Sequence, residues 1–433
     1  MFQNIGKDSP IVINSYPPIV LRKIADSDFI WQADEPGEAE RRVASLYVHI
    51  PFCPRKCDFC HFLSFSAPNS LVEKYVRYVK KEIDLLVKIP GIHSQKFAAL
   101  YFGGGTPTYL KTGYLRELLE HIFRQFSFSK GFEFCVEVRP GTEATREKLA
   151  LLKEYGVNRI SIGAQGFDQE ILDINGRRHT VAAFDTIYRR LRETGFTNIN
   201  IDILSGMLNE SEETWNKTIK KLLELAPENI SLYFLHIYRK SGLFEEIKNS
   251  PGKQKHLPDE SFKKKLLSIF YRQVFDAGYQ ASTTYTFRKS PVYEHVNRKL
   301  RNQGCDYIGL GLSANSYFSR ILYENTKEMD KYFQYLDEDR LPIYCASKKL
   351  TRDQAMKRAI IFGLRTAVID RRDFQSQFGQ DPMQVYGDIF EKIAKQGIVE
   401  IDGNEIKLTR EYFATAYDVA RMYFWSDEGG IKK

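Results

Sequence analysis

Short runs of β-branched and aromatic residues alternate with longer amphipathic stretches from Ser45 onward. The apolar runs predict strands at 46–50, 97–102, 132–138, 158–163, 198–204 and 230–237, and the stretches between them predict helices at 69–89, 112–126, 143–155, 181–194 and 211–225. Asn209 or Ser211, and Thr142, stand where helix N-caps are expected. Parallel strands need a crossover connection, so these alternating units predict a parallel sheet. We therefore expect an α/β fold, an open or closed barrel with its site at the carboxyl ends of the strands.

The chain divides into four predicted segments. Residues 1–44 are expected to form an irregular N-terminal extension, and 45–250 the core of the barrel. Residues 251–335 complete the barrel and supply a pocket-closing loop, and their lysine-rich part, 252–303, is expected to be irregular. Residues 336–433 predict three helices and a hairpin turned at 402–404, an order that resembles a winged-helix-like module. We expect this module to pack on the barrel or to act as a lid, because it carries no concentrated basic stripe for nucleic acid.

Composition narrows the class of protein. With 433 residues, 43% of them hydrophobic, the chain is long enough for one large domain and a smaller one and is not globally disordered. The net charge of +8 comes from Lys and Arg spread among acidic residues, which indicates solvated helix faces and is compatible with a mildly basic pocket for an anionic small molecule. No apolar run approaches the roughly 18 residues that cross a bilayer, and the N-terminus lacks the regions of a signal peptide. We expect a cytoplasmic protein without a membrane partner.

Three of the six cysteines lie within eight residues, at Cys53, Cys57 and Cys60, in the spacing C-x3-C-x2-C. The other three are scattered, which is not the pattern of a secreted disulfide framework. Three thiolates on a short loop can ligate three irons of a 4Fe-4S cluster and leave the fourth iron open. A structural zinc ion needs four closed ligands, and His49, His61 or a remote cysteine could supply the fourth. The cysteine spacing alone is compatible with either an iron–sulfur cluster or a zinc ion.

The residues around these cysteines resemble the opening of radical S-adenosylmethionine (SAM) enzymes. Tyr47 and the run His49-Ile-Pro-Phe-Cys53 precede the same cysteine spacing, and more narrowly they are similar to the oxygen-independent coproporphyrinogen III oxidase-like family. The resemblance covers residues 45–425, roughly the whole chain after the extension. It implies a partial (β/α)6 radical SAM barrel with a C-terminal helical, winged-helix-like module. It also implies a 4Fe-4S cluster on Cys53, Cys57 and Cys60, one or two molecules of SAM, and a reducing partner such as flavodoxin or ferredoxin.

Further motifs of the family follow in order along the chain. Glycines in the run 102–107 (FGGGTP) allow close approach of the backbone to a ligand, and carboxylates at strand ends can accept hydrogen bonds from ribose hydroxyls. The loop 309–315 is similar to a late loop that helps to close the pocket. By resemblance, the cofactor-binding residues are Tyr47, Phe59, Gly104, Gly105, Thr106, Glu137, Gln165, Arg177, Asp202, His236 and Asn315. His236 is also the candidate for a catalytic residue.

The resemblance implies reductive cleavage of SAM to methionine and a 5′-deoxyadenosyl radical, which removes hydrogen from an unactivated carbon. Two departures bear on the substrate. The oxidases carry a fourth cysteine two residues after the third. This chain has Phe62 at that position, and the absence of a cysteine there is common in the methylase, heme-handling and heme-chaperone branches. Tyr412 stands where glycine is usual near the C-terminus of the family.

Three hypotheses about function follow. The first is transfer of a one-carbon unit from a second SAM, by methylation or cyclopropanation, to an aromatic or tetrapyrrole substrate. The second is oxidative decarboxylation of a porphyrinogen, or a related anaerobic reaction of a tetrapyrrole, against which the missing fourth cysteine counts. The third is a heme-binding chaperone, against which the N-terminal extension counts mildly, because those proteins usually begin near the cysteine motif.

Overall fold

A computed structural model describes residues 21–24, 27–31, 43–89, 91–93, 95–239, 241–250, 252 and 256–424 of the chain. Most of the predicted extension, 1–44, lies outside these residues. Its described parts are a short strand, β1 (Arg22–Lys23), and a 3-10 turn at Asp28–Trp31. β1 pairs with the edge strand β13 (Ile343–Ala346), and the Trp31 ring packs on Phe318 and Tyr323. The described parts of the extension therefore cover the far edge of the sheet.

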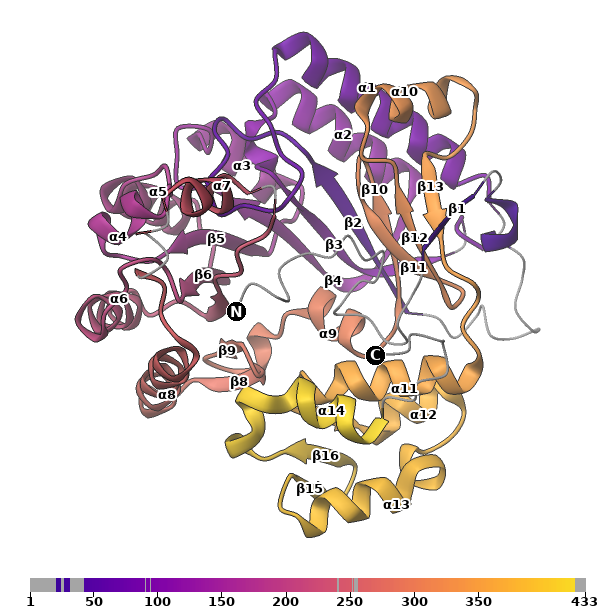
Figure 1. The fold of residues 1–433 in the computed structure, drawn as a ribbon. Coiled ribbons are helices and arrows are strands. Elements are labelled where there is room, and N and C mark those ends of the chain that lie inside the picture. The colour runs from indigo at the N-terminus through magenta and orange to yellow at the C-terminus, as the bar shows by residue number, and fades with distance from the viewer. Residues whose placement is uncertain are drawn as a thin grey trace.

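Six parallel strands lie side by side in the order of the chain, as predicted. They are β2 (Ala44–Ile50), β3 (Lys96–Gly104), β4 (Ser127–Val138), β5 (Arg159–Gln165), β6 (Ile199–Ser205) and β7 (Asn229–Phe234). Each strand is apolar and buried along most of its length, because helices cover its outer side (Figure 1). The prediction for β7 was three residues too long, since that strand ends at Phe234 and not at Ile237. The α/β fold is confirmed.

The sheet is an open barrel within the described residues, because β1 and β8 form its two separate edges. β10 (Asp306–Leu310) adds to β2 in parallel, and antiparallel strands continue the sheet on both sides. The antiparallel strands other than β1 and β13 are β11 (Asn315–Phe318), β12 (Ile321–Asn325), β9 (Thr286–Arg288) and β8 (Gln280–Thr283). The carboxyl ends of β2 to β7 thus meet at one rim, which positions the site.

The predicted crossover helices are present with bounds close to those expected. They are α1 (Asn69–Leu86), α2 (Thr112–Gln125), α3 (Arg146–Glu154), α5 (Val181–Glu193) and α6 (Glu212–Leu225), with the short α4 (Gln169–Ile174) between β5 and α5. Ser211 caps α6 and completes a capping box with Thr214. The expectation of a cap at Thr142 was wrong, because Thr145 accepts the hydrogen bond from the Lys148 amide and begins α3.

The lysine-rich segment after the barrel core is more regular than predicted. It contains α8 (Glu260–Asp276), capped by Asp259, with Leu266, Leu267, Phe270 and Val274 on its buried face. The run of three lysines at 263–265 precedes that apolar stripe and obscured it. The other helices of this part are α7 (Gly242–Asn249), α9 (Val296–Asn302) and α10 (Met329–Asp337).

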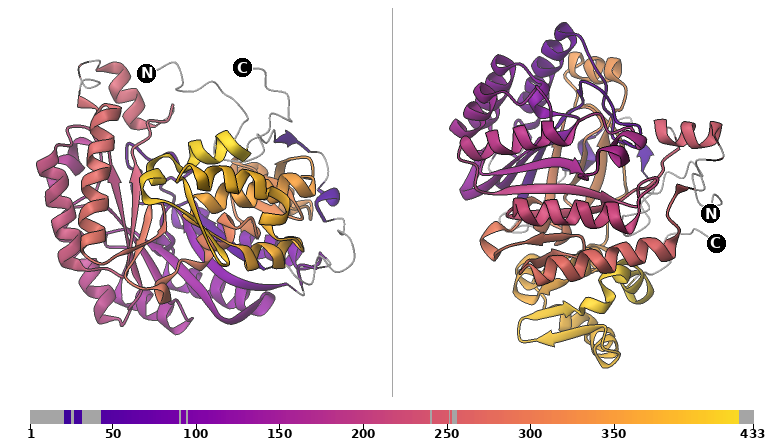
Figure 2. Two further views of the ribbon diagram at one scale, coloured as in Figure 1. Left: turned by 90° about the horizontal axis from the view of Figure 1, so that it is seen from below. Right: turned by 90° about the vertical axis from the view of Figure 1, so that its left-hand side faces the viewer.

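The C-terminal module has a hydrophobic core of its own and lies below the barrel (Figures 1 and 2). Its elements are α11 (Arg352–Leu364), β14 (Val368–Asp370), α12 (Arg371–Phe378), α13 (Pro382–Lys395), β15 (Val399–Asp402), β16 (Glu405–Leu408) and α14 (Ala416–Phe424). The three predicted helices and the hairpin are present, and β14 adds a third strand beside β16. This order of helices and strands resembles a winged helix.

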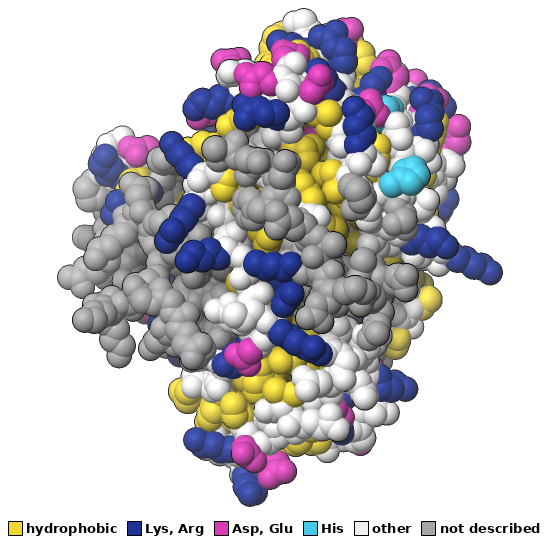
Figure 3. All heavy atoms as spheres, turned by 90° about the vertical axis from the view of Figure 1, so that its right-hand side faces the viewer, with side chains coloured by type: hydrophobic (Ala, Val, Ile, Leu, Met, Phe, Trp, Pro, Cys, Tyr) yellow, Lys and Arg dark blue, Asp and Glu magenta, His cyan; other side chains and the backbone are white. Residues whose placement is uncertain are grey.

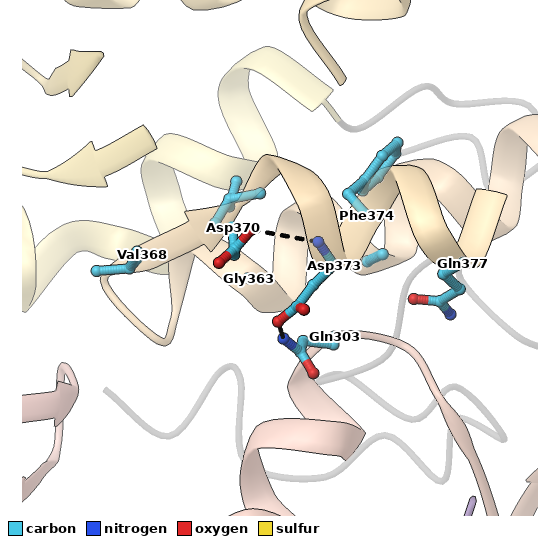
Figure 4. Close-up of a pocket in the computed structure, with 9 residues that line it drawn as sticks. Gln303, Gly363, Val368, Asp370, Asp373, Phe374 and Gln377 are labelled. Atoms are coloured by element: carbon cyan, nitrogen blue, oxygen red, sulfur yellow. Dashed lines mark hydrogen bonds between the residues drawn. The ribbon is translucent and has the colours of Figure 1, made fainter. Parts of the chain in front are cut away.

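Helix α9 connects the barrel to this module. Asp373 on α12 accepts a hydrogen bond from the Gln303 side chain at 2.7 Å and pairs with Lys299 at 3.2 Å. A small pocket lies at this junction between Gln303 and the start of α12 (Figure 4). The module is therefore held against the base of the barrel by polar contacts to α9.

Charged side chains are mixed over the surface. On the face seen in Figure 3, Lys and Arg side chains are spread from top to bottom, with Asp and Glu among them at both ends. No helix among the described residues is long and apolar enough to cross a membrane.

Candidate active site

The three clustered cysteines lie on a loop that follows β2 at the carboxyl rim of the sheet. The loop is closed by two backbone hydrogen bonds, from the Cys53 amide to Phe65 at 3.1 Å and from the Phe65 amide to Pro51 at 3.0 Å. Its tip is tied to the start of α7, because the Leu243 amide donates to the Asp58 carbonyl at 2.7 Å. The loop is therefore fixed at both its base and its tip.

Donor groups from two other loops reach two of the sulfur atoms. The Thr106 hydroxyl lies 3.4 Å from Cys53 Sγ, and Arg177 Nη1 donates to Cys57 Sγ at 3.1 Å. Burial raises the pKa of Cys60, and the nearby thiols of Cys57 and Cys53 raise it further. A hydrogen bond or a positive charge at sulfur favours the thiolate, which is the form that ligates iron. This environment suits a metal cluster that neutralises three thiolates at once.

The residues fit an iron–sulfur cluster better than a single zinc ion. Among the described residues, no three His, Cys, Asp or Glu side chains lie close enough together to hold one metal ion. A 4Fe-4S cluster takes each thiolate on a different iron, so its ligands are spread more widely than those of one ion. Both ring nitrogens of His49 are engaged, with the Tyr47 hydroxyl at 3.0 Å and the Leu63 carbonyl at 3.2 Å. His49 is thus a structural residue and not a fourth ligand.

The glycine run after β3 brings the backbone against the cysteine loop. The Gly105 amide donates to Ile50 at 2.8 Å and the Thr106 amide to Phe52 at 2.8 Å. Gly104 has φ +106°, and a Cβ atom there would lie 2.5 Å from the His49 ring. These amides hold the two rim segments together.

Glu137, near the end of β4, lies on the inner side of the barrel. Its Oε1 accepts from the Tyr101 hydroxyl at 2.7 Å, and its Oε2 accepts from the Gly104 amide at 3.1 Å. Burial raises the pKa of Glu137 to about 7, and the charge of Asp202 adds to this shift. A carboxyl group with this pKa exchanges a proton near neutral pH.

Asp202 occupies the matching place on β6. Its carboxylate accepts from the Ser161 hydroxyl at 3.0 Å and from the Asn200 amide group at 2.8 Å. Burial raises the pKa of Asp202, while the nearby Arg298 guanidinium opposes the shift. Glu137 and Asp202 therefore face the same interior space and influence each other's ionisation.

Gln165 and Arg177 lie beside this pair at the rim of β5. Gln165 ends the strand with φ +70°, a left-handed conformation that is uncommon for a residue other than glycine. Arg177 follows α4 and also donates to the Gly163 carbonyl on β5. Arg177 therefore connects β5 to Cys57.

The remaining predicted residues are more dispersed. Tyr47 is on β2 and stacks on Tyr101, with ring centroids 6.0 Å apart. Phe59 packs with a small apolar cluster between α4 and α7, and Asn315 is the exposed first residue of β11. His236 is exposed in the loop after β7, with its pKa lowered by partial burial and by Lys263. The structure thus gathers Tyr47, Glu137 and Asp202 inside the barrel and leaves His236 exposed in the loop after β7.

Several interior residues were missed by the sequence analysis. Arg298 on α9 donates to the Tyr233 hydroxyl at 2.6 Å and lies over the Tyr285 ring at 5.2 Å. Its Nη1 atom is buried without a hydrogen-bond partner in the described part of the chain. Tyr101 on β3, which donates to Glu137, belongs to the same group. No sequence pattern indicated that α9 turns Arg298 into the barrel.

Comparison with known proteins agrees with this geometry. Residues 47–222 match the model of the Radical SAM superfamily, and residues 350–411 match the HemN C-terminal domain. The heme chaperone HemW of Bacillus subtilis (strain 168) is 27% identical, covering 85% of this chain and 95% of its own length. The oxygen-independent coproporphyrinogen III oxidase of Escherichia coli (strain K12) is also 27% identical, covering 85% of this chain and 82% of its own length.

Solved structures extend the similarity to both parts of the fold. The coproporphyrinogen III oxidase (HemN) from Escherichia coli, described as a radical SAM enzyme, has a TM-score of 0.77 and 25% sequence identity. It covers 95% of this chain and 96% of its own. The similarity therefore includes the barrel with its cysteine loop as well as the C-terminal module. This chain is therefore a radical SAM enzyme with a HemN C-terminal domain, similar over most of its length to coproporphyrinogen III oxidase, and its cofactors are a 4Fe-4S cluster and SAM.

Proposed function

We propose that this enzyme acts on a tetrapyrrole by radical chemistry, as a relative of the coproporphyrinogen III oxidases. The observation that carries the proposal is the extent of the similarity to the oxidase structure, which includes the C-terminal module as well as the barrel. The relatives named above are oxidases and heme chaperones. They favour a tetrapyrrole ligand over our first hypothesis, one-carbon transfer to an unactivated carbon.

Each group of residues has a part in this proposal. When bound, the cluster and SAM supply a primary carbon radical that takes hydrogen from the substrate. Cys53, Cys57 and Cys60 hold the cluster, and Arg177 donates to Cys57 Sγ and keeps that ligand oriented. Hydrogen-bond donors that contact a metal-ligating side chain orient that ligand and tune the metal centre.

The interior carboxyl groups bind the organic part of SAM. A carboxylate offers about four acceptor positions, of which Glu137 uses two, for Tyr101 and Gly104. The positions that remain can accept from the amino group or the ribose hydroxyls of a ligand, and the same holds for Asp202. The partly buried tyrosines around them, Tyr47 and Tyr101, keep water from this space and so protect a reactive radical.

Heme transport is the second candidate function. Phe62 stands where the oxidases, by resemblance, carry a fourth cysteine, and this chain covers 95% of the length of the Bacillus subtilis heme chaperone. A chaperone would hold heme in a one-to-one complex and would not convert it to a product.

One assay separates these functions. The protein is reconstituted with iron and sulfide under anaerobic conditions and reduced with dithionite, which replaces the flavodoxin or ferredoxin that we propose as the electron donor. SAM is added with coproporphyrinogen III, with hemin or with neither, and 5′-deoxyadenosine and S-adenosylhomocysteine are measured by chromatography. The proposal expects 5′-deoxyadenosine that increases when a tetrapyrrole is present.

Other outcomes would replace the proposal. Bound hemin without an increase in 5′-deoxyadenosine would favour the chaperone. Formation of S-adenosylhomocysteine together with 5′-deoxyadenosine would show that two SAM molecules have different fates, and would restore one-carbon transfer.

A further inference from the structure

Four aromatic or imidazole rings meet between the cysteine loop and the loop after β7. His61 and Phe62 follow Cys60 directly, and His236 and Tyr238 come from the loop after β7. The His61 ring centroid lies 4.2 Å from that of Phe62 and 4.2 Å from that of Tyr238, at interplanar angles of 32° and 28°. The His236 ring is 6.3 Å from Tyr238 at a steep angle. We call these four residues the rim ring cluster.

The rim ring cluster is exposed although it is aromatic. Phe62 is 54% exposed and Tyr238 is 42% exposed, whereas the other Phe, Tyr and Trp side chains that the structure describes are buried or partly buried. His61 and His236 are exposed as well, and neither makes a hydrogen bond with another described residue. A group of exposed aromatic rings on a folded protein is typical of a binding surface.

The backbone beneath the rings is held firmly. Ser241 caps α7 and donates both its amide and its hydroxyl to the Tyr238 carbonyl, at 3.0 and 2.8 Å. Asp58, in the cysteine loop, pairs with Arg178 at 2.7 Å and accepts from the Leu243 amide. The two loops that carry the rings are thus fixed to each other, and the rings keep their relative positions without a ligand.

The stack leaves an imidazole edge available for metal binding. The lone pair of an imidazole nitrogen lies in the plane of the ring, so stacking on both faces of His61 orients the ring without blocking its nitrogens. A histidine nitrogen is a common axial ligand of heme iron. Phe62 and Tyr238 would then meet the macrocycle with their edges, a favoured contact between aromatic systems.

The charges near the rings match the rest of a heme molecule. Lys56 lies within electrostatic range of His61, and Lys263 within range of His236. Heme carries two propionates, and ammonium groups at the margin of an aromatic surface can pair with them. Iron, macrocycle and propionates thus each have a partner in this one cluster.

We propose that the rim ring cluster binds heme, with His61 as an axial ligand of the iron. The inference rests on the proposed tetrapyrrole function and deepens it, because it places a tetrapyrrole against the cysteine loop and the loop after β7. It does not depend on Glu137, Asp202 or cleavage of SAM.

The test is a titration of the cluster-loaded protein with hemin, followed by the absorption and electron paramagnetic resonance spectra of the heme. Wild type is expected to bind one hemin with an imidazole-ligated spectrum. His61→Ala should lose that spectrum and bind hemin at least ten times more weakly, and free imidazole added to this variant should restore the spectrum. His121→Ala is the matched control, because His121 is on α2 and pairs with Asp84.

Protoporphyrin IX without iron separates ligation from stacking, and it should bind wild type and His61→Ala alike. If His61→Ala binds hemin with wild-type affinity and spectrum, the inference is wrong. Whatever the result of the hemin titration, 5′-deoxyadenosine formation by His61→Ala is measured without hemin and reports on the radical chemistry separately. A failed hemin titration with intact SAM cleavage would therefore overturn the rim ring cluster and leave the proposed function standing.

Discussion

Two carboxyl groups in this molecule, Glu82 and Glu137, have similarly raised pKa values in different surroundings. Burial raises the pKa of both Glu82 and Glu137 to about 7. Glu82, on α1, accepts from the Gly311 amide at 2.8 Å, the Asn325 amide group at 2.7 Å and the Tyr332 hydroxyl at 2.5 Å. No charged side chain contributes to its shift, whereas Asp202 and Arg298 both act on Glu137.

The difference separates a structural carboxyl group from one that is ready to bind a ligand. Glu82 is 2% exposed and joins α1 to the loop after β10 and to α10. Glu137 is half-buried, has two donors, and faces another carboxyl group across the interior of the barrel. A shifted pKa therefore indicates a candidate site only together with unused acceptor positions and charged neighbours.

The largest effect is expected at the metal ligands, which distinguish the site from the rest of the molecule. Cys57→Ala removes one of three thiolates, so the reconstituted protein should lose most of its iron and all measurable SAM cleavage. Cys305→Ala, outside the loop, is the control and should retain both. Iron content at the wild-type level in Cys57→Ala would sink the assignment of the cluster.

Glu137→Gln should affect ligand binding much more than folding. Loss of a charged acceptor is worth about 1.5–3 kcal/mol, so SAM should bind the cluster-loaded variant roughly 10 to 100 times more weakly. The unfolding free energy should change by about 1 kcal/mol or less, because relief of the repulsion from Asp202 offsets the weakened bond to Gly104. Equilibrium dialysis with SAM and urea unfolding measure the two quantities, and unchanged SAM affinity would remove Glu137 from the site.

Glu82→Gln should show the opposite pattern. The Gln side chain has an NH2 group in place of one carboxylate oxygen and cannot accept a hydrogen bond there. One of the three donors, Gly311, Asn325 or Tyr332, is therefore left without its acceptor. The expected cost is about 1–3 kcal/mol of unfolding free energy. SAM affinity should stay within twofold of wild type, and a larger loss would mean that the two carboxyl groups are not functionally distinct.

The smallest expected effect is the pH dependence of the stability difference between wild type and Glu82→Gln. The pKa of Glu82 is about 7 in the folded chain, against an ordinary value of 4.5, so the folded state holds this proton more tightly between those two values. The stability that Glu82 contributes is therefore complete below about pH 4.5 and declines as the pH rises to 7, whereas Gln does not titrate. The stability advantage of wild type over Glu82→Gln should shrink across that window.

Comparing the two proteins cancels the other titrating groups. Burial lowers the pKa of His49 to about 4 and that of His179 to about 2, so these residues change stability in the opposite direction. Urea unfolding of both proteins at pH 5 and pH 7 gives the difference directly. An advantage that grows with pH would contradict a raised pKa for Glu82.

The sequence predicted the parts of the fold that local patterns determine. Buried strands such as β5 are continuous apolar runs, and the cysteine spacing is contained in eight residues, so both were found without knowledge of tertiary structure. His236 was placed in a strand because the apolar run continues to Ile237, but β7 ends at Phe234 and the following residues leave the sheet. Arg298 was missed because its direction depends on α9, whose N-terminal amides at Val296 and Asn297 are bound by Glu133 from β4, far away in sequence.

The most direct test of the central claim is the transfer of a labelled hydrogen atom. The reduced, cluster-loaded enzyme is incubated with SAM and a tetrapyrrole deuterated at its side-chain carbons, and the 5′-deoxyadenosine is examined by mass spectrometry. If the enzyme generates a carbon radical beside a tetrapyrrole, the 5′-deoxyadenosine will carry deuterium from that substrate. 5′-Deoxyadenosine without deuterium, formed at the same rate whether or not the tetrapyrrole is present, would contradict the account.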